Sequence, residues 1–257
     1  MSNLCHIDDT VMWDDLLMKP FLLALHVASA LIQILFFAFL NKKIRQKLIR
    51  SWANRLLIIL QVKVVVSGGV PEILRSNNYL IVSNHISWLD IHVINSIRAQ
   101  VFVAKSDVAD WPIFGWIAKM IGTIFIQREK LSDLKRVIQL IKSRLNDGDS
   151  VCIFPEGTSS DGKSVLEFRS NLFEAVANSD HLILPIAIQY REHQQYSDRA
   201  AFIGDMGLLD SIKKILKSRV LEAHIVINEP LSTNGTRQGM ALQARQSILG
   251  TSLFQDS

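Results

Sequence analysis

Residues 132–154, SDLKRVIQLIKSRLNDGDSVCIF, combine a helical pattern with the pattern of a buried strand. Apolar side chains recur three or four positions apart through 132–146, as on one face of a helix. They are Leu134, Val137, Ile138, Ile141 and Leu145. Ser132 is the expected N-cap, and Asp147-Gly148 ends the helix. Residues 151–154 then form a short apolar run typical of a strand, so this stretch indicates one unit of an α/β fold.

The same alternation extends in both directions from this unit. Further β-rich runs occur at residues 62–66, 79–83, 101–104, 123–126, 182–188 and 225–227, with helical patterns between them. This order predicts an α/β fold with a mixed, largely parallel sheet flanked by helices. No interdomain linker interrupts the pattern, so we expect one domain over residues 61–257. The run at 182–188 contains Pro185, which lacks an N–H and is expected at a sheet edge or a bulge.

Composition and charge exclude several classes of protein. The chain has 257 residues, of which 49% are hydrophobic and 20% charged, so it is not disordered. Two cysteines are too few for a disulfide scaffold, and Cys152 in its apolar run is expected to be a buried thiol. The net charge of +4 is unevenly distributed, because seven basic residues and no acidic ones lie within 41–63. A local basic block indicates an anionic partner, either nucleic acid or a membrane surface.

This basic block follows an apolar segment long enough to cross a bilayer. Residues 20–40 contain no charged side chain and would form a helix about 30 Å long. We therefore expect a membrane partner and no nucleic acid, with residues 1–60 as a membrane-anchoring segment. Because basic residues stay on the cytoplasmic side, the remainder of the chain should face the cytoplasm. The acidic residues before the segment argue against a cleaved signal peptide.

Two alternatives to a full membrane span stay open: a helix buried in a soluble protein, and a helix pair that enters one leaflet. In the second alternative, residues 42–60 form a basic amphipathic arm. Its apolar side chains recur at helical spacing, at Ile44, Leu48, Trp52, Leu56 and Ile59. The sequence does not separate this arrangement from a full span.

The first candidate for chemistry is the segment 84–90, NHISWLD, directly after the strand predicted at 79–83. His85 and Asp90 face apart on a regular helix or strand, so they meet only where the chain turns from strand to helix. Asp90 would then hold one imidazole nitrogen of His85 and leave the other as a general base. The alternative is structural, because Ser87 and Asp90 have the spacing of a capping box that starts a helix.

Two further segments follow predicted strands. Residues 154–158, FPEGT, place Glu156 in a Pro/Gly turn that could bind hydroxyls or could be an ordinary solvated turn. Residues 122–128, GTIFIQR, end in Arg128, whose planar guanidinium suits a phosphate but equally suits solvent. The seven histidines show no i, i+4 metal pair, so no metal site is predicted.

Taken together and in this order, these segments and the strand with Pro185 resemble the glycerolipid acyltransferase family. That family shows Asn-His-x4-Asp, Gly-x-x-Phe-x-x-Arg, Phe-Pro-Glu-Gly-Thr and an apolar strand with Pro. The resemblance in these motifs spans residues 62–227, and the membrane-associated N-terminus is also similar to the family. The resemblance implies a glycerolphosphate acyltransferase-like fold. It also implies transfer of a fatty acyl group from a thioester to an alcohol, with His85 as general base and Asp90 as the residue that orients it.

The resemblance further implies a set of substrate-binding residues. They are Lys105, Arg128, Glu156, Gly157, Thr158 and Arg169. Arg128 matches a ligand of the acceptor phosphate, Lys105 matches a basic position with a phosphate or head-group role, and residues 156–158 match the acceptor-binding turn. A silent lipid-binding protein and a membrane-anchored hydrolase are weaker alternatives, because His85 and Asp90 are both present and the histidines are scattered.

The implied reaction converts 1-acylglycerol-3-phosphate to phosphatidic acid, with acyl-CoA or acyl carrier protein as donor and no cofactor. The implied location is the bacterial inner membrane, with the catalytic domain on the cytoplasmic side. One position departs from the family: many phosphatidate-forming members have Arg directly after Phe-Pro-Glu-Gly-Thr, where this chain has Ser159. Arg169 could compensate for the missing cation. The Thr-Ser-Ser-Asp-Gly version instead resembles branches that acylate lyso-ornithine lipid, so this lysolipid, or another, is the alternative acceptor.

Overall fold

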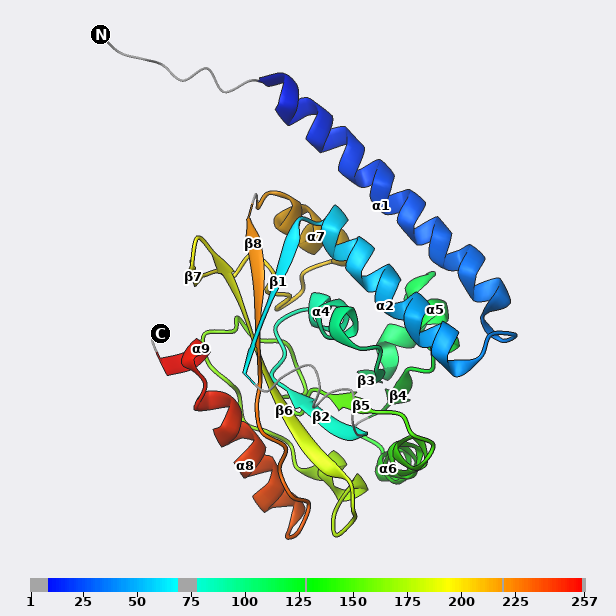
Figure 1. The fold of residues 1–257 in the computed structure, drawn as a ribbon, viewed down its shortest axis with the longest axis vertical. Coiled ribbons are helices and arrows are strands. Elements are labelled where there is room, and N and C mark those ends of the chain that lie inside the picture. The colour runs from blue at the N-terminus through cyan, green and yellow to red at the C-terminus, as the bar shows by residue number, and fades with distance from the viewer. Residues whose placement is uncertain (1–8, 69–77, 128, 219, 256–257) are drawn as a thin grey trace.

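The computed structural model describes residues 9–68, 78–127, 129–218 and 220–255, and its architecture is the predicted α/β fold (Figure 1). The strands are β1 Val62–Gly68, β2 Tyr79–Ser83, β3 Val101–Lys105, β4 Ile124–Ile126, β5 Val151–Ile153, β6 Leu182–Glu192, β7 Gln195–Tyr196 and β8 Leu221–Ile227. The α-helices are α1 Asp9–Phe37, α2 Lys42–Ile59, α4 Leu89–Ile97, α5 Phe114–Met120, α6 Leu131–Asn146, α7 Leu208–Leu216, α8 Arg237–Leu249 and α9 Ser252–Gln255. Two 3₁₀ segments, η1 Ser106–Asp110 and η2 Asn171–Ala175, complete the described elements.

The sheet has the order β1-β8-β6-β2-β5-β3-β4, with β7 paired to β6. Five of its pairings are parallel, and β6 is antiparallel to both β8 and β7. The expected mixed, largely parallel sheet is therefore confirmed. Because β2, β5, β3 and β4 are parallel to one another, their carboxyl ends share one edge of the sheet and their amino ends the opposite edge. The central strand β2 is buried along its whole length, as its continuous apolar sequence predicts.

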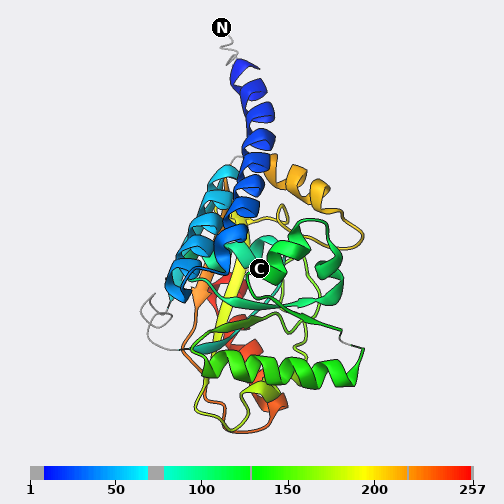
Figure 2. The same ribbon diagram turned by 90° about the vertical axis from the view of Figure 1, so that its right-hand side faces the viewer.

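Helices cover both faces of this sheet (Figure 2). One core cluster joins the sheet to α2, α4 and α7, and a second joins it to α6, α8 and η2. The apolar stripe of α6 forms part of the second cluster, with Val137, Ile138, Ile141 and Leu145 buried. Cys152 on β5 is a buried free thiol, as expected. The sequence pattern therefore identified the side chains that hold this layer to the sheet.

One local expectation was wrong, and a second was correct in one of its two alternatives. Ser132 is not the N-cap of α6, because the helix begins at Leu131 and its first turn is held by Asp133, whose carboxylate accepts the N–H of Gln127. Pro185 was expected at a sheet edge or a bulge. It is not on an edge strand, because β6 lies between β8 and β2, but it lies opposite a bulge, since the pairing shifts by one residue between Ile186–Ile227 and Ile183–Leu231. The sheet tolerates it because the regular ladder to β8 ends at Ile186, and the carbonyl of Pro185 accepts the N–H of Asn228 just beyond that ladder. Several predicted strands are also longer than expected, β6 by four residues to Glu192.

The N-terminal helices α1 and α2 run side by side and are joined by a short turn (Figure 1). The imidazole of His26 stacks on Trp52 at 4.3 Å, and the Trp52 indole N–H donates to the carbonyl of His26. At the other end of the pair, Lys19 donates to the side chain of Gln61. The apolar part of α1, Met18–Phe37, is long enough to cross a membrane, and only 22% of it is buried, which argues against a core helix of a soluble protein.

Helix α2 contacts the core of the sheet on one side and is exposed on another. Its residues Leu56 and Leu57 lie in the core cluster of the sheet, whereas Lys43, Lys47 and Arg55 of the same helix are exposed. The turn before it is held by Asn41, whose side chain accepts the N–H of Ile44 as an N-cap. The segment predicted as an anchor is thus packed into the α/β domain through α2.

Candidate active site

The segment 84–90 turns from strand to helix at the carboxyl edge of the sheet. Strand β2 ends at Ser83, and α4 begins at Leu89. His85 therefore lies in the turn and Asp90 in the first turn of α4, which is the arrangement that the spacing requires for contact. The His85 Nδ1 atom is 2.9 Å from Oδ2 of Asp90. The predicted contact is present, and its catalytic role stays a prediction.

The Asp90 carboxylate is fully buried and is held by backbone as well as side-chain donors. Its Oδ2 atom accepts the N–H groups of Ile86 at 2.7 Å and Ser87 at 2.9 Å. The bond from the Ser87 N–H to the Asp90 carboxylate is the one that an acidic residue makes in a capping box. The Ser87 hydroxyl in turn accepts the N–H of Leu89. Asp90 therefore starts the helix and holds His85 with the same oxygen, so the two sequence alternatives are both present in one residue.

A third side chain, which sequence reasoning missed, completes the coordination of Asp90. The hydroxyl of Tyr190, on β6, donates to Oδ1 of Asp90 at 2.8 Å. Burial and the nearby Asp90 charge raise the pKa of Tyr190 well above its ordinary value, so this hydroxyl keeps its proton. Tyr190 lies 100 residues after Asp90 in the chain, so no local sequence pattern indicated this contact.

Asn84 fastens the turn to the neighbouring strand. Its amide donates to the carbonyl of Ile188 and accepts the N–H of the same residue, both at 2.8 Å. An Asn side chain matches one backbone residue in this way because it carries a donor and an acceptor side by side. Sequence analysis did not predict this role for Asn84, although Asn84 is the first residue of the Asn-His-x4-Asp pattern.

The imidazole of His85 is confined on one face and open on one edge. It stacks on Phe154 at 4.1 Å between ring centres, and its side chain is 22% exposed. Among the described residues, no hydrogen bond to its Nε2 atom is present. The backbone carbonyl of His85 accepts both the N–H and the hydroxyl of Ser160. The second ring nitrogen is thus available for a substrate proton, and the loop after Thr158 is tied to the base.

Glu156, predicted to bind the acceptor, points into the protein. It is 4% exposed, and its Oε1 atom accepts the N–H of Leu166 at 3.3 Å. Its Oε2 atom is buried and has no hydrogen-bond partner among the described residues. Burial raises the pKa of Glu156 to about 8, with a further contribution from the Asp90 charge, against backbone N–H groups of His85 and Leu166 that lower it. The raised pKa favours the protonated side chain at neutral pH, and its printed hydrogen bond joins the turn to Leu166.

The structure describes four of the other predicted substrate residues. Gly157 has a φ of +79°, a backbone conformation that favours glycine, and Thr158 beside it is exposed. Lys105, at the carboxyl end of β3, forms an ion pair with Asp107. Arg169 is exposed, and its backbone N–H donates to the carbonyl of Pro155, next to Glu156. Arg128 lies outside the described residues.

An imidazole held by a buried carboxylate at the carboxyl edge of a mostly parallel sheet is an arrangement that suits general-base catalysis in an α/β enzyme. The Acyltransferase family model matches residues 63–189. The chain is 34% identical to the lyso-ornithine lipid O-acyltransferase of Pseudomonas aeruginosa, over 80% of this chain and 78% of that one. The chain therefore belongs to the glycerolipid acyltransferase family and is an acyltransferase.

Two further relatives bear on function and fold. The 1-acyl-sn-glycerol-3-phosphate acyltransferase of Neisseria gonorrhoeae is 27% identical, over 70% of this chain and 69% of that one. The crystal structure of the 1-acyl-sn-glycerophosphate acyltransferase of Thermotoga maritima superposes with a TM-score of 0.63 at 22% identity, over 90% of each chain. At this identity the structural match confirms the glycerolphosphate acyltransferase-like fold.

Replacing Tyr190 with Phe removes one donor to the Asp90 carboxylate. The Tyr190 hydroxyl fixes the Asp90 carboxylate that orients His85, and a hydrogen bond to a charged group contributes roughly 1.5 to 3 kcal/mol. We therefore expect the less well oriented His85 to lower turnover about tenfold, with little change in the acceptor KM. Without this donor, Asp90 holds the imidazolium of His85 more strongly. The acid limb of the pH profile of kcat/KM should therefore move to higher pH.

The matched control for this variant is Tyr79→Phe, which removes a buried hydroxyl at the amino end of β2. It should leave the pH profile in place. If a folded Tyr190→Phe enzyme kept the wild-type rate and profile, Tyr190 would be a packing residue and no part of the site.

Glu156→Gln should change how stability depends on pH. Between the ordinary pKa of Glu and about 8, the folded chain keeps the Glu156 proton while the unfolded chain loses it. The free energy of unfolding should therefore fall as pH rises through this window, by at most about 1.4 kcal/mol per pH unit from this group. Thermal unfolding in neutral detergent from pH 5 to pH 8 should show a flatter dependence in the variant. Glu167→Gln is the exposed control, and an equal slope in both variants would contradict the assignment.

Proposed function

We propose that this chain transfers a fatty acyl group from an acyl thioester to the free hydroxyl of a lysolipid, with His85 as general base. The observation that supports this most directly is the imidazole held through Nδ1 by a buried carboxylate while its other nitrogen stays open. A hydroxyl is a poor nucleophile at neutral pH, so it needs such a base, whereas a thioester is already an activated acyl donor.

The proposed reaction needs two proton transfers through one imidazole. His85 Nε2 takes the proton of the acceptor hydroxyl as its oxygen bonds to the thioester carbonyl carbon. The tetrahedral adduct then collapses, the carbon–sulfur bond breaks, and the imidazolium returns the proton to the thiolate. Asp90 stabilises the imidazolium between these steps, and its two oxygens accept from His85, Tyr190 and two backbone N–H groups. The donor in this proposal is acyl-CoA or acyl carrier protein, and no metal or other cofactor takes part.

We propose lyso-ornithine lipid as the acceptor. The loop of residues 159–162 lies against the catalytic turn, because Ser160 bonds to His85 and a Cβ at Gly162 would come within 2.6 Å of Ile86. Where many phosphatidate-forming members carry Arg, this loop carries Ser159, whose hydroxyl donates to the carbonyl of Phe202. The loop therefore offers a hydroxyl and the Asp161 carboxylate in place of that cation. This suits an ornithine head group, which brings an ammonium as well as a carboxylate, and the similarity to the Pseudomonas aeruginosa enzyme supports it.

The second candidate acceptor is 1-acylglycerol-3-phosphate, which would give phosphatidic acid. Its phosphate carries a charge of about −1.5 to −2 at neutral pH and would need cations. Arg169 is exposed near the Glu156 turn, and Arg128 and Lys105 match basic positions of the family pattern. The similarity to the Neisseria gonorrhoeae enzyme favours this acceptor.

We propose that α1 and α2 enter one leaflet of the membrane as a pair. The apolar part of α1 runs along α2 from the Lys19–Gln61 contact to the connecting turn, and α2 is itself packed on the sheet. A perpendicular span would separate α1 from these partners. Exposed apolar side chains of α1, such as Phe21, Leu25 and Ile32, would contact lipid. In this proposal the domain lies on the cytoplasmic face of the bacterial inner membrane, where the exposed cations of α2 meet anionic lipid.

His85→Ala should lower turnover about 10²- to 10⁴-fold in a folded enzyme, because it removes the general base. The measurement uses detergent-purified protein with labelled acyl-CoA or acyl carrier protein, and lyso-ornithine lipid, 1-acylglycerol-3-phosphate and lysophosphatidylcholine as acceptors. His181→Ala, at the amino end of β6, is the matched control and should stay active. Full activity of a folded His85→Ala enzyme would contradict the mechanism. Strong preference for 1-acylglycerol-3-phosphate would make it, and not lyso-ornithine lipid, the first candidate acceptor.

Ser159→Arg should move acceptor preference toward 1-acylglycerol-3-phosphate. A guanidinium at this position can bind a phosphate with two N–H groups, and a charged hydrogen bond of roughly 1.5 to 3 kcal/mol predicts at least a tenfold change in the ratio of kcat/KM values. Ser159→Gln is the control, since it also breaks the bond to Phe202 and adds length but no charge. An equal change in both variants would assign the effect to the lost Ser159 contact.

A further inference from the structure

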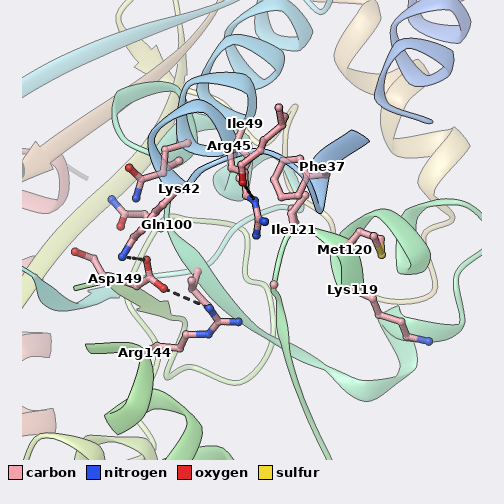
Figure 3. A pocket seen from close by; sticks show the side chains of 16 residues that line it. Phe37, Lys42, Arg45, Ile49, Gln100, Lys119, Met120, Ile121, Arg144 and Asp149 are labelled. Atoms are coloured by element: carbon pink, nitrogen blue, oxygen red, sulfur yellow. Dashed lines mark hydrogen bonds and ion pairs between the residues drawn. The ribbon is translucent and has the colours of Figure 1, made fainter. Parts of the chain in front are cut away.

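A second site lies at the edge of the sheet opposite to His85. A cavity of about 420 Å³ opens at the amino ends of β3, β4 and β5, where Gln100, Gly122 and Ser150 line it (Figure 3). Since these strands are parallel to β2, the cavity and the catalytic turn are separated by the length of the sheet. Its volume is within the usual range of ligand pockets and exceeds what one inorganic anion fills.

The cavity is lined by four cations and one carboxylate. Lys42 and Arg144 both pair with Asp149, at 2.7 Å and 3.4 Å. The guanidinium of Arg45 donates to the carbonyls of Ala38 and Leu40 at the end of α1. Lys119 is exposed and forms no ion pair with any described residue. Asp149 balances one of the four charges, so the lining is strongly positive and favours an anion.

Helix ends account for only part of this charge. Lys119 and Arg144 lie in the last turns of α5 and α6, where cations interact favourably with the helix dipole. That interaction does not explain Gln100, which is 7% exposed and lies in the wall of the cavity. Its side-chain nitrogen and oxygen are both buried without a hydrogen-bond partner among the described residues. Buried amides are normally paired, so a polar partner is missing at this wall.

The remaining wall is apolar and comes from the membrane-proximal helices. Phe37 and Leu40 end α1, Ile49 lies on α2, and Met120 and Ile121 end α5. Figure 3 shows Phe37 and Met120 on the side of the cavity away from Asp149. A ligand that fits this lining has an anionic, hydrogen-bonding head and an apolar part directed toward the α1–α2 pair.

We propose that the cavity binds the head group of an anionic phospholipid, with the phosphodiester near Lys119 and Arg144. Such a lipid would join the α1–α2 turn, α5 and the end of α6 through one ligand, and would favour docking on anionic membrane. The inference rests on the proposed membrane attachment, but it is independent of the acyl-transfer chemistry at the opposite edge.

Binding is measured as the thermal stabilisation of the full chain in neutral detergent, titrated with dihexanoyl-phosphatidylglycerol, dihexanoyl-phosphatidylcholine or inorganic phosphate. We expect stabilisation by the phosphatidylglycerol and little by the phosphatidylcholine. The variant Lys119→Gln/Arg144→Gln should weaken the apparent affinity for the phosphatidylglycerol roughly thirtyfold, from two cations near an anionic lipid. The charge-conserving variant Lys119→Arg/Arg144→Lys should retain binding.

The matched control is Lys135→Gln/Lys142→Gln, which removes the same charge from α6 at residues that do not line the cavity. It should bind the phosphatidylglycerol as the wild type does. Equal weakening in the control, or wild-type binding by Lys119→Gln/Arg144→Gln, would overturn the site. Equal stabilisation by inorganic phosphate would overturn the lipid assignment and leave a free-anion site. Because the readout is binding, failure here would leave the acyl-transfer proposal untouched, and loss of activity in His85→Ala would not bear on it.

Discussion

The buried carboxylate of Asp90 is the interaction on which the site depends. A charge removed from water is costly unless its oxygens are fully hydrogen-bonded, and here both oxygens are occupied. The donors come from the turn, from the imidazole and from Tyr190 on β6, so the charge cannot be accommodated until α4 and the sheet are in place. The fold and the orientation of His85 are therefore the outcome of one requirement.

The acceptor side is joined to this centre through backbone contacts. Ser160 donates to the carbonyl of His85, and buried Glu156 accepts the N–H of Leu166. The side chain of Ser159 faces Phe202 and takes no part in holding the base. This division separates the two properties of the enzyme: residues that position the base are internal to the turn, and the residue that differs from the phosphatidate-forming pattern is beside it. In the proposed mechanism, acceptor preference can therefore change while His85 and Asp90 keep their contact.

The carboxyl and amino edges of the parallel strands gather different kinds of residues. The carboxyl edge gathers His85, Asp90 and the loop of residues 159–162, as the strand direction requires for residues that follow β2 and β5. The amino edge gathers cations and apolar side chains from α1, α2, α5 and α6, next to the helix pair. In the proposed arrangement, the lysolipid reaches one edge and the bulk lipid contacts the other, so anchoring and catalysis use separate surfaces of one sheet.

The sequence by itself determined the α/β class, the alternation of elements, the apolar and basic character of the N-terminus and the turn that brings His85 to Asp90, because periodicity and short turns are encoded within a few residues. It did not determine that Tyr190 donates to Asp90, that the Asn84 amide bonds to the backbone of Ile188, or that Pro185 lies on a strand inside the sheet. Nor did it reveal that Asp90 is both a helix cap and the partner of His85, or that Gln100 faces cations from three helices. These contacts join residues far apart in the chain, and only the strand order and register of the folded sheet bring them together.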